Sequence, residues 1–457
     1  MSELAERVSS RLRNSQTLRL VTVGFLVLIL QIPVAMIGGQ VSERKERGLQ
    51  AVSEVSSKWG DRQMLAGPML VVPYAHTWTE VSRNGQSVER TGFRYASFLP
   101  DELNVVANAT SDIRKRGIFE VPVYKLDLTV AGRFTPPDLS KLALNPATMN
   151  WDKAYVVMGV SDTRAIQQAS NLAWDGQTIA FDPGTGGQQV IQNGIHAVVG
   201  AGADARSVEF SFPLVINGSQ AIRFTPFGKA TEVRLESNFP HPSFQGNWLP
   251  AERVVAGDGF EAQWKIPFLG RSFPQAWVDP GKIWESIERS TFGVDFVNPV
   301  DHYRMAERSV KYASLFILLT FAALWLFEVR AGVRVHPIQF LLLGAALCLF
   351  YLLELSLSEH LAFPLAFAIA SLAIVGMVMA YGLVVLRELH RALVVGSGVG
   401  LLYVYLYVLL VNEDYALLFG SIGLFVILAL IMYATRRVDW YSVGTKQKAD
   451  RAGEEST

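Results

Sequence analysis

The chain has 457 residues, half of them hydrophobic, and its 41 basic and 41 acidic residues cancel. This length exceeds what one domain normally takes, and zero net charge gives no reason to expect nucleic acid as a partner. The single cysteine, Cys348, lies in an apolar run, so no disulfide can form within the chain. We therefore expect more than one region, each held together by core packing.

The N-terminus combines basic residues with a long apolar run at residues 20–37, which Pro33 interrupts. The run is long for the core of a signal peptide, and no Ala-x-Ala pattern follows it. We predict an uncleaved transmembrane helix at 20–39, kinked by Pro33, after a cytoplasmic segment at 1–19. A cleaved signal peptide is the alternative.

Residues 40–309 differ in character from the rest of the chain. Apolar residues at spacings of three and four predict a helix over 41–59 that leaves the membrane. Apolar and polar residues then alternate, as at 124–130 and 260–266, which is typical of half-buried strands. Asn217-Gly218 predicts a hairpin turn. We expect a mainly-β, sandwich-like domain with few helices.

Five further apolar segments follow, at 310–327, 338–357, 361–385, 392–411 and 415–434. Each has about 20 residues, enough to cross roughly 30 Å of hydrocarbon as a helix. Three residues at 412–414 can join the last two segments only as an antiparallel hairpin. The fold class is therefore a membrane protein of six transmembrane α-helices, one N-terminal and five C-terminal, with a tail at 435–457.

Lysine and arginine gather at alternate ends of these segments, which predicts that both termini are cytoplasmic and the β domain lies outside. The residues are Arg7, Arg11, Arg13, Arg19, Arg330, Arg334, Arg387, Arg391, Arg436, Arg437, Lys446, Lys448 and Arg451.

The opposite loops are acidic, with Glu359, Glu413 and Asp414, and Glu354 lies inside a span near the same side. A carboxyl group within a membrane is costly unless it is paired, protonated or wet, so Glu354 is a functional candidate. The alternative is that Glu354 only reaches the outer interface.

Basic residues Arg304, Arg308 and Lys311 share one helix face just before the second span. We predict a charge cluster in which this face pairs with the acidic residues and clamps the β domain onto the helices.

At the opposite side, Arg387 and Arg391 anchor a charged turn, with contact to a lipid headgroup as the sharper alternative. Gly396 and Gly400 form a GxxxG pair, which indicates close helix packing.

Motifs of catalysis or metal binding are not found in the sequence. The seven histidines lack metal-ligand spacing, and HExxH, Walker A and GxSxG patterns do not occur. We therefore expect no catalytic residue, no metal and no cofactor.

Several stretches in order resemble the CreD family of bacterial inner-membrane proteins over most of the length. They begin at residues 67–74, 117–124, 246–250, 270–275, 307–312, 336–339 and 356–360, and end with 390–440. The resemblance implies an inner-membrane protein associated with cell-envelope integrity in Gram-negative bacteria, regulated by a two-component system and linked to tolerance of some colicins and to the β-lactam response. It implies no reaction.

Two functions from different classes remain open. The first is a non-enzymatic envelope protein acting through its periplasmic domain on a periplasmic protein, peptidoglycan or an outer-envelope component. The alternative is a transporter or channel for an ion or lipid that uses the acidic residues at the outer face of the bundle. An intramembrane enzyme ranks third, because the spans carry no nucleophile–base pattern.

Overall fold

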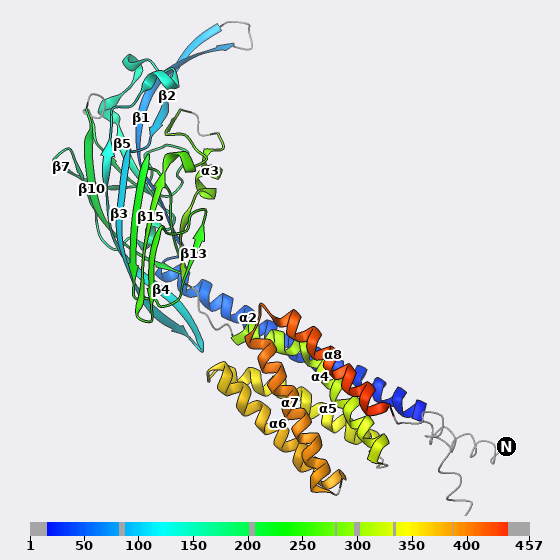
Figure 1. Ribbon diagram of the computed structural model, residues 1–457. Coiled ribbons are helices and arrows are strands. Elements are labelled where there is room, and N and C mark those ends of the chain that lie inside the picture. The colour runs from blue at the N-terminus through cyan, green and yellow to red at the C-terminus, as the bar shows by residue number, and fades with distance from the viewer. Residues whose placement is uncertain are drawn as a thin grey trace, which may run out of the picture. The chain divides into compact units, whose positions relative to one another are not determined.

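The computed structural model describes residues 16–81, 87–200, 206–278, 281–296, 302–331, 335–386 and 388–436 (Figure 1). The chain divides into two compact units. The helical bundle comprises Met1–Arg47 and Val300–Thr457, and the β domain comprises Gly48–Pro299. The division falls inside one long helix.

The helical bundle confirms the six predicted spans. Within the described ranges, six helices are long and apolar enough to cross a membrane. They are α2 (Gln16–Trp59), α4 (His302–Ala331), α5 (Pro337–Ser358), α6 (Phe363–Leu386), α7 (Leu389–Val411) and α8 (Ala416–Thr435).

Two helices extend well beyond the predicted apolar runs. α2 continues through Pro33 to Trp59, and its 44 residues measure about 66 Å at 1.5 Å per residue. α4 begins at His302, before the predicted span at 310. The helix predicted over 41–59 is confirmed as the continuation of α2, while the predicted domain boundaries at 40 and 309 shift, because residues 40–47 and 302–309 belong to the helical bundle. Hydropathy finds only the part of a helix that meets lipid, so it misses polar ends.

The bundle core forms where small residues let helices approach. A Cβ added to Gly344 of α5 would lie 2.1 Å from a methyl carbon of Leu30 and 2.9 Å from the ring of Phe321. These side chains belong to α2 and α4, so glycine allows three helices to meet. The aromatic ring of Phe350 is fully buried and packs on Phe367 of α6 and Tyr403 of α7.

The β domain contains two mixed sheets. In the described residues, one sheet has the order β13-β17-β11-β1-β5-β9-β8, with β2 on β1 and β16 on β2. Its strands are β1 (Gln63–Val81), β2 (Ser87–Phe98), β5 (Tyr155–Val160), β8 (Asp182–Pro183), β9 (Gly194–Val198), β11 (Ala221–Phe224), β13 (Pro242–Gly246), β16 (Ala276–Trp277) and β17 (Phe292–Phe296).

The second sheet has the order β14-β15-β12-β3-β4-β10-β6-β7. Its strands are β3 (Glu102–Arg116), β4 (Phe119–Phe134), β6 (Asn171–Trp174), β7 (Gln177–Ala180), β10 (Val208–Ser219), β12 (Ala230–Ser237), β14 (Glu252–Ala256) and β15 (Gly259–Pro267). The connections carry helix α3 (Ile283–Arg289) and the 3-10 turns Leu139–Leu142, Pro146–Thr148, Trp151–Lys153, Thr163–Ala165 and Phe268–Gly270.

One hydrophobic core joins the two sheets, as a sandwich requires. It includes Met69 and Val157 from the first sheet and Leu126, Phe212 and Trp264 from the second, each with at most 1% of its surface exposed. Buried and exposed residues alternate along β3, β12 and β15, which confirms the predicted two-residue period.

The hairpin predicted at Asn217-Gly218 is wrong. Strand β10 runs through both residues, and the chain turns at Gln220 into β11, a strand of the other sheet. Gly218 serves packing instead, because a Cβ there would lie 2.3 Å from the ring of Tyr124. The Tyr124 hydroxyl donates a hydrogen bond to the Ala221 carbonyl, across the junction between the sheets. The glycine therefore makes room for a side chain rather than for a turn.

Candidate functional site

Acidic and basic side chains meet at one end of the bundle, which we call the Glu413 end. Arg304 and Arg308, one turn apart on α4, each lie 3.4 Å from the carboxylate of Glu413 in the α7–α8 connection. The predicted pairing of α4 with this acidic loop is therefore present within the bundle. The proposed clamping of the β domain remains a prediction.

Arg308 does more than form an ion pair. Its guanidinium nitrogens donate hydrogen bonds of 3.1 and 3.0 Å to the carbonyls of Leu410 and Leu409. Its side chain is only 15% exposed, whereas that of Arg304 is 53% exposed. The last carbonyls of α7 lack helical partners, and a cation there also faces the negative end of the helix dipole. Arg308 thus ties α4 to the end of α7.

The other charged residues of this end pair differently from the prediction. Glu359 lies 3.6 Å from Arg44 of α2 and accepts a hydrogen bond of 3.2 Å from the Tyr303 hydroxyl. Lys311 pairs with Glu307 on its own helix at 3.1 Å, and Glu307 also pairs with Lys45 of α2. The single basic face of three residues is therefore divided, because Lys311 has an acidic partner one turn away. Asp414 is exposed.

Glu354 is buried rather than interfacial. It is 0% exposed on α5, which contradicts the alternative that it reaches the outer interface. Its Oε2 accepts a hydrogen bond of 2.7 Å from the hydroxyl of Ser309 on α4, and its Oε1 has no hydrogen-bond partner. No basic side chain of the described residues forms an ion pair with it. Helices α4 and α5 place this carboxyl group inside the bundle.

Polar groups from three helices surround this carboxyl group. Tyr351 precedes Glu354 by three residues and so lies on the same face of α5. Tyr403 of α7 is 4% exposed, interacts electrostatically with Glu354, and its hydroxyl also has no hydrogen-bond partner. We name Ser309, Glu354 and Tyr403 the buried polar cluster. Sequence reasoning missed Ser309 and Tyr403, since their contact with α5 joins residues 45 or more positions apart.

The opposite end of the bundle, which we call the Arg19 end, has its own buried carboxylate. Glu328 of α4 is 6% exposed and pairs with Arg19 of α2. Arg391 pairs with Glu388 at 2.6 Å, and Arg387 lies outside the described residues. The predicted headgroup contact at Arg387 and Arg391 therefore stays a prediction.

The glycines of α7 lie against α6. A Cβ on Gly396 would lie 2.0 Å from Cγ of Met379, and one on Gly400 would lie 3.8 Å from Val375. These positions let α6 and α7 pack closely. On α8, Gly423 makes room for Tyr405, while Gly420 has no neighbour within 4 Å. Of these two α8 glycines, only Gly423 therefore meets another helix.

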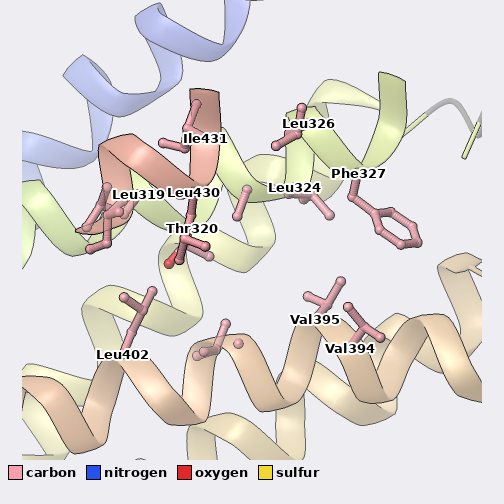
Figure 2. Close-up of a pocket in the computed structure, with 14 residues that line it drawn as sticks. Leu319, Thr320, Leu324, Leu326, Phe327, Val394, Val395, Leu402, Leu430 and Ile431 are labelled. Carbon is pink, nitrogen blue, oxygen red and sulfur yellow. The ribbon is translucent and has the colours of Figure 1, made fainter. Parts of the chain in front are cut away.

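An apolar groove of about 320 Å³ lies between α4, α7 and α8 (Figure 2). Val394, Val395 and Leu402 of α7 face the α4 side chains across it. Thr320 supplies the polar atom of its lining, and that hydroxyl donates to the Phe316 carbonyl of its own helix. Apart from Thr320, the side chains that line the groove are apolar.

The β domain carries a separate exposed feature, which we call the free ribbon: residues 75–81 of β1 paired with residues 87–93 of β2. In the described residues no third strand pairs with this segment, and Figure 1 shows it extending beyond the body of the β domain. Trp78 is 44% and Phe93 63% exposed. Trp78 stacks on His76 with ring centroids 6.2 Å apart.

Metal-binding clusters are not found among the described residues, where no three His, Cys, Asp or Glu side chains gather.

Comparison with known proteins identifies the family. The sequence matches the family described as Inner membrane protein CreD over residues 15–441. It is 34% identical over 433 residues to Inner membrane protein CreD of Escherichia coli (strain K12), covering 93% of this chain and 94% of that one.

Solved structures add little. Two M1 zinc metallopeptidases, one of them from Deinococcus radiodurans, match at 10% identity with TM-scores of 0.18 and 0.17. Each match covers 37% of this chain, and 38% and 39% of the two enzymes. Likenesses this weak carry no argument about fold or reaction. The family match and the six apolar helices agree, and the chain belongs to the CreD family of multi-pass inner membrane proteins.

Proposed function

We propose that this protein contributes to cell-envelope integrity without enzymatic activity, and that its β domain acts in the periplasm by binding a protein partner. The distribution of Lys and Arg supports an arrangement in which both termini are cytoplasmic and the β domain is outside. Membership of the family supports a location in the inner membrane. The β domain supplies a surface suited to binding.

The free ribbon is the observation that carries this proposal. A two-stranded ribbon is only marginally stable alone, and its outer edges present unpaired backbone groups. Exposed aromatic residues such as Trp78 and Phe93 are typical of binding surfaces. An extended segment of a partner can pair with such an edge while its apolar side chains cover these rings. We therefore infer that the partner is a polypeptide rather than peptidoglycan or lipid.

Complementation of a strain lacking this protein tests the proposal. We expect the full chain with Trp78→Ser and Phe93→Ser to insert at normal levels but to lose most of the restored detergent resistance. The matched control is Leu269→Ser, because Leu269 is 83% exposed and belongs to the 3-10 turn Phe268–Gly270, outside the ribbon residues. Full resistance with the ribbon variant, at equal abundance, would overturn the proposal. Binding of purified peptidoglycan that requires Trp78 would replace the protein partner with a glycan.

Transport of an ion or lipid is the second candidate, and the buried Glu354 favours it. It ranks lower because the polar groups at mid-membrane depth satisfy themselves. The hydroxyls of Thr320, Ser397 and Ser421 each donate to a carbonyl of their own helix. No polar chain links Glu354 to Glu328 in the described spans. A Glu354→Gln variant that loses envelope resistance, while the ribbon variant keeps it, would reverse this ranking.

A further inference from the structure

The described bundle contains two buried carboxyl groups in opposite electrostatic settings. Glu328 at the Arg19 end is 6% exposed and has the guanidinium of Arg19 as its partner. Glu354 near the Glu413 end is 0% exposed and receives one hydrogen bond, from the Ser309 hydroxyl. The two residues are the same chemical group, so their surroundings decide their charge.

The cations that flank Ser309 on α4, and those of α2 at the Glu413 end, are already engaged. Arg308 donates to the carbonyls of Leu409 and Leu410 and pairs with Glu413. Lys311 and Lys45 both pair with Glu307, and Arg44 pairs with Glu359. These contacts leave Glu354 without a positive partner among the described residues.

The groups that face Glu354 are weak acids and aromatic rings. On α5 the group is Tyr351, on α7 it is Tyr403, and on α4 the Ser309 hydroxyl donates to the carboxyl group. From the α6 side, Phe367 packs on Phe350, which in turn packs on Tyr403 at a centroid distance of 4.3 Å. None of these side chains carries a positive charge, and the rings keep the site apolar.

An ionised carboxylate in such a site is costly. Removing the ion from water costs several kcal/mol, which only a cation or several hydrogen-bond donors repay. The protonated form has no net charge, and its O–H provides a donor of its own. Glu354 Oε1 and the Tyr403 hydroxyl are both buried without a hydrogen-bond partner. The packed helices therefore leave two polar groups at this site without the hydrogen bonds that they could form.

We propose that Glu354 is a proton-binding site within the membrane. Its carboxyl group holds a proton while α4, α5 and α7 are packed as observed. The site does not involve the free ribbon. The proton-binding proposal can therefore be tested independently of the proposed function.

Infrared spectroscopy of the full chain in phospholipid vesicles tests the protonation directly. We expect the wild type at neutral pH to show a carbonyl stretching band of a carboxylic acid, and Glu354→Gln to lose it. Glu328→Gln is the matched control and should leave the band unchanged, because Glu328 is paired with Arg19. A wild type whose spectrum equals that of Glu354→Gln in this region would overturn the proposal.

Chemical labelling of the wild type gives a second readout that needs no variant to fold. Dicyclohexylcarbodiimide enters apolar sites and reacts with protonated carboxyl groups. We expect peptide mass spectrometry to find the adduct on Glu354 and not on Glu328. Labelling of Glu328 without Glu354, or of neither residue in a chain that also lacks the acid band, would contradict the proposal. Labelling of Glu354 that disappears as the pH is raised would support it.

Discussion

The two regions of this protein each bury an ionisable side chain, and the surroundings of the two side chains differ. In the β domain, Arg271 is 8% exposed and donates to the carbonyls of Pro226, Phe227 and Gly228, with Gln275 as a further partner. In the bundle, Glu354 accepts one hydrogen bond, from the hydroxyl of Ser309. A guanidinium has five donors in a fixed fork, so one residue can hold a whole loop of carbonyls.

The comparison separates a side chain that is buried to hold the fold together from one that is buried as part of a functional site. Burial lowers the pKa of Arg271 to about 10, so its guanidinium still carries a charge at neutral pH and keeps its donors. Arg271 thereby links the loop before β12 to the segment before β16. Each residue keeps one buried atom unpaired, Nε of Arg271 and Oε1 of Glu354, but Glu354 forms a single hydrogen bond and links only α4 and α5. A polar group that is buried but only partly used is the better candidate for a changing state.

The largest expected effect tests the structural half of this comparison. Arg271→Leu should lower the free energy of unfolding of the β domain by about 3 kcal/mol, because each buried carbonyl left without a donor costs about 1–3 kcal/mol. Chemical denaturation of the full chain, followed by protease sensitivity, measures the change. Arg234→Leu is the control, since Arg234 is 49% exposed and its ion pairs should contribute less than about 1 kcal/mol. Equal effects of the two changes would remove the distinction.

The second prediction concerns the link between α4 and α7. Arg308→Gln should destabilise the bundle by about 2 kcal/mol, because hydrogen bonds to a charged group contribute about 1.5–3 kcal/mol and the carbonyls of Leu409 and Leu410 lose their donor. Arg304→Gln should cost less than about 1 kcal/mol, since that side chain is 53% exposed. Thermal unfolding in detergent micelles gives the two Tm shifts. An Arg304 variant as damaging as the Arg308 variant would show that charge, not capping, matters here.

The third prediction concerns helix approach. Gly396→Val should destabilise the bundle by about 1–3 kcal/mol, because its Cβ would overlap Met379 and overpacking forces neighbours to shift. Gly420→Val is the matched control, since a Cβ there meets nothing within 4 Å. Thermal unfolding of both variants in the same detergent decides the point. If Gly420→Val costs as much, the effect reflects helix propensity and not packing.

The smallest effect is expected at Asp101, where β3 begins. Burial opposes ionisation of Asp101, but the Lys229 ammonium and the Thr135 hydroxyl and amide outweigh it and hold the pKa below its ordinary value. A depressed pKa stabilises the fold above the ordinary pKa, and this stabilisation is lost as the pH falls through the folded-state pKa. Asp101→Asn should therefore cost less than about 1 kcal/mol at pH 7, and the cost should shrink as the pH falls below the ordinary pKa of 3.8 and through the folded-state pKa. Denaturation at pH 7 and at a series of acidic pH values, with Asp127→Asn as control, measures the difference. A cost that stays constant over the acidic range would point to geometry rather than charge.

Local patterns in the sequence predicted much of the architecture. Runs of about 20 apolar residues gave the spans, and a two-residue period gave β4, β10, β12 and β15, because both signals depend on neighbours along one element. The hydroxyls of Thr320 and Ser421 donate to their own helices, as expected of small polar residues in lipid. The Asn217-Gly218 hairpin failed because the same dipeptide serves cross-sheet packing of Tyr124.

The candidate site was predicted in part. Arg304, Arg308 and Glu413 meet as the charge pattern suggested, since opposite charges at the same end of neighbouring spans have few other partners. Lys311 was assigned to that cluster, but Glu307 on its own helix holds it. The free ribbon carried no sequence signal, because the same alternating pattern describes a strand inside a sheet and one beyond its edge.

By itself, the sequence determined that this protein crosses a membrane six times and carries a large β region between its first and second spans. The physical reason is that lipid and a half-buried sheet each impose a periodicity that a single segment displays. Only the tertiary structure decided that Glu354 is enclosed with Ser309 and Tyr403 while Glu328 has a cation. The charge of a buried carboxyl group depends on neighbours from other helices, and helix packing alone brings those neighbours together.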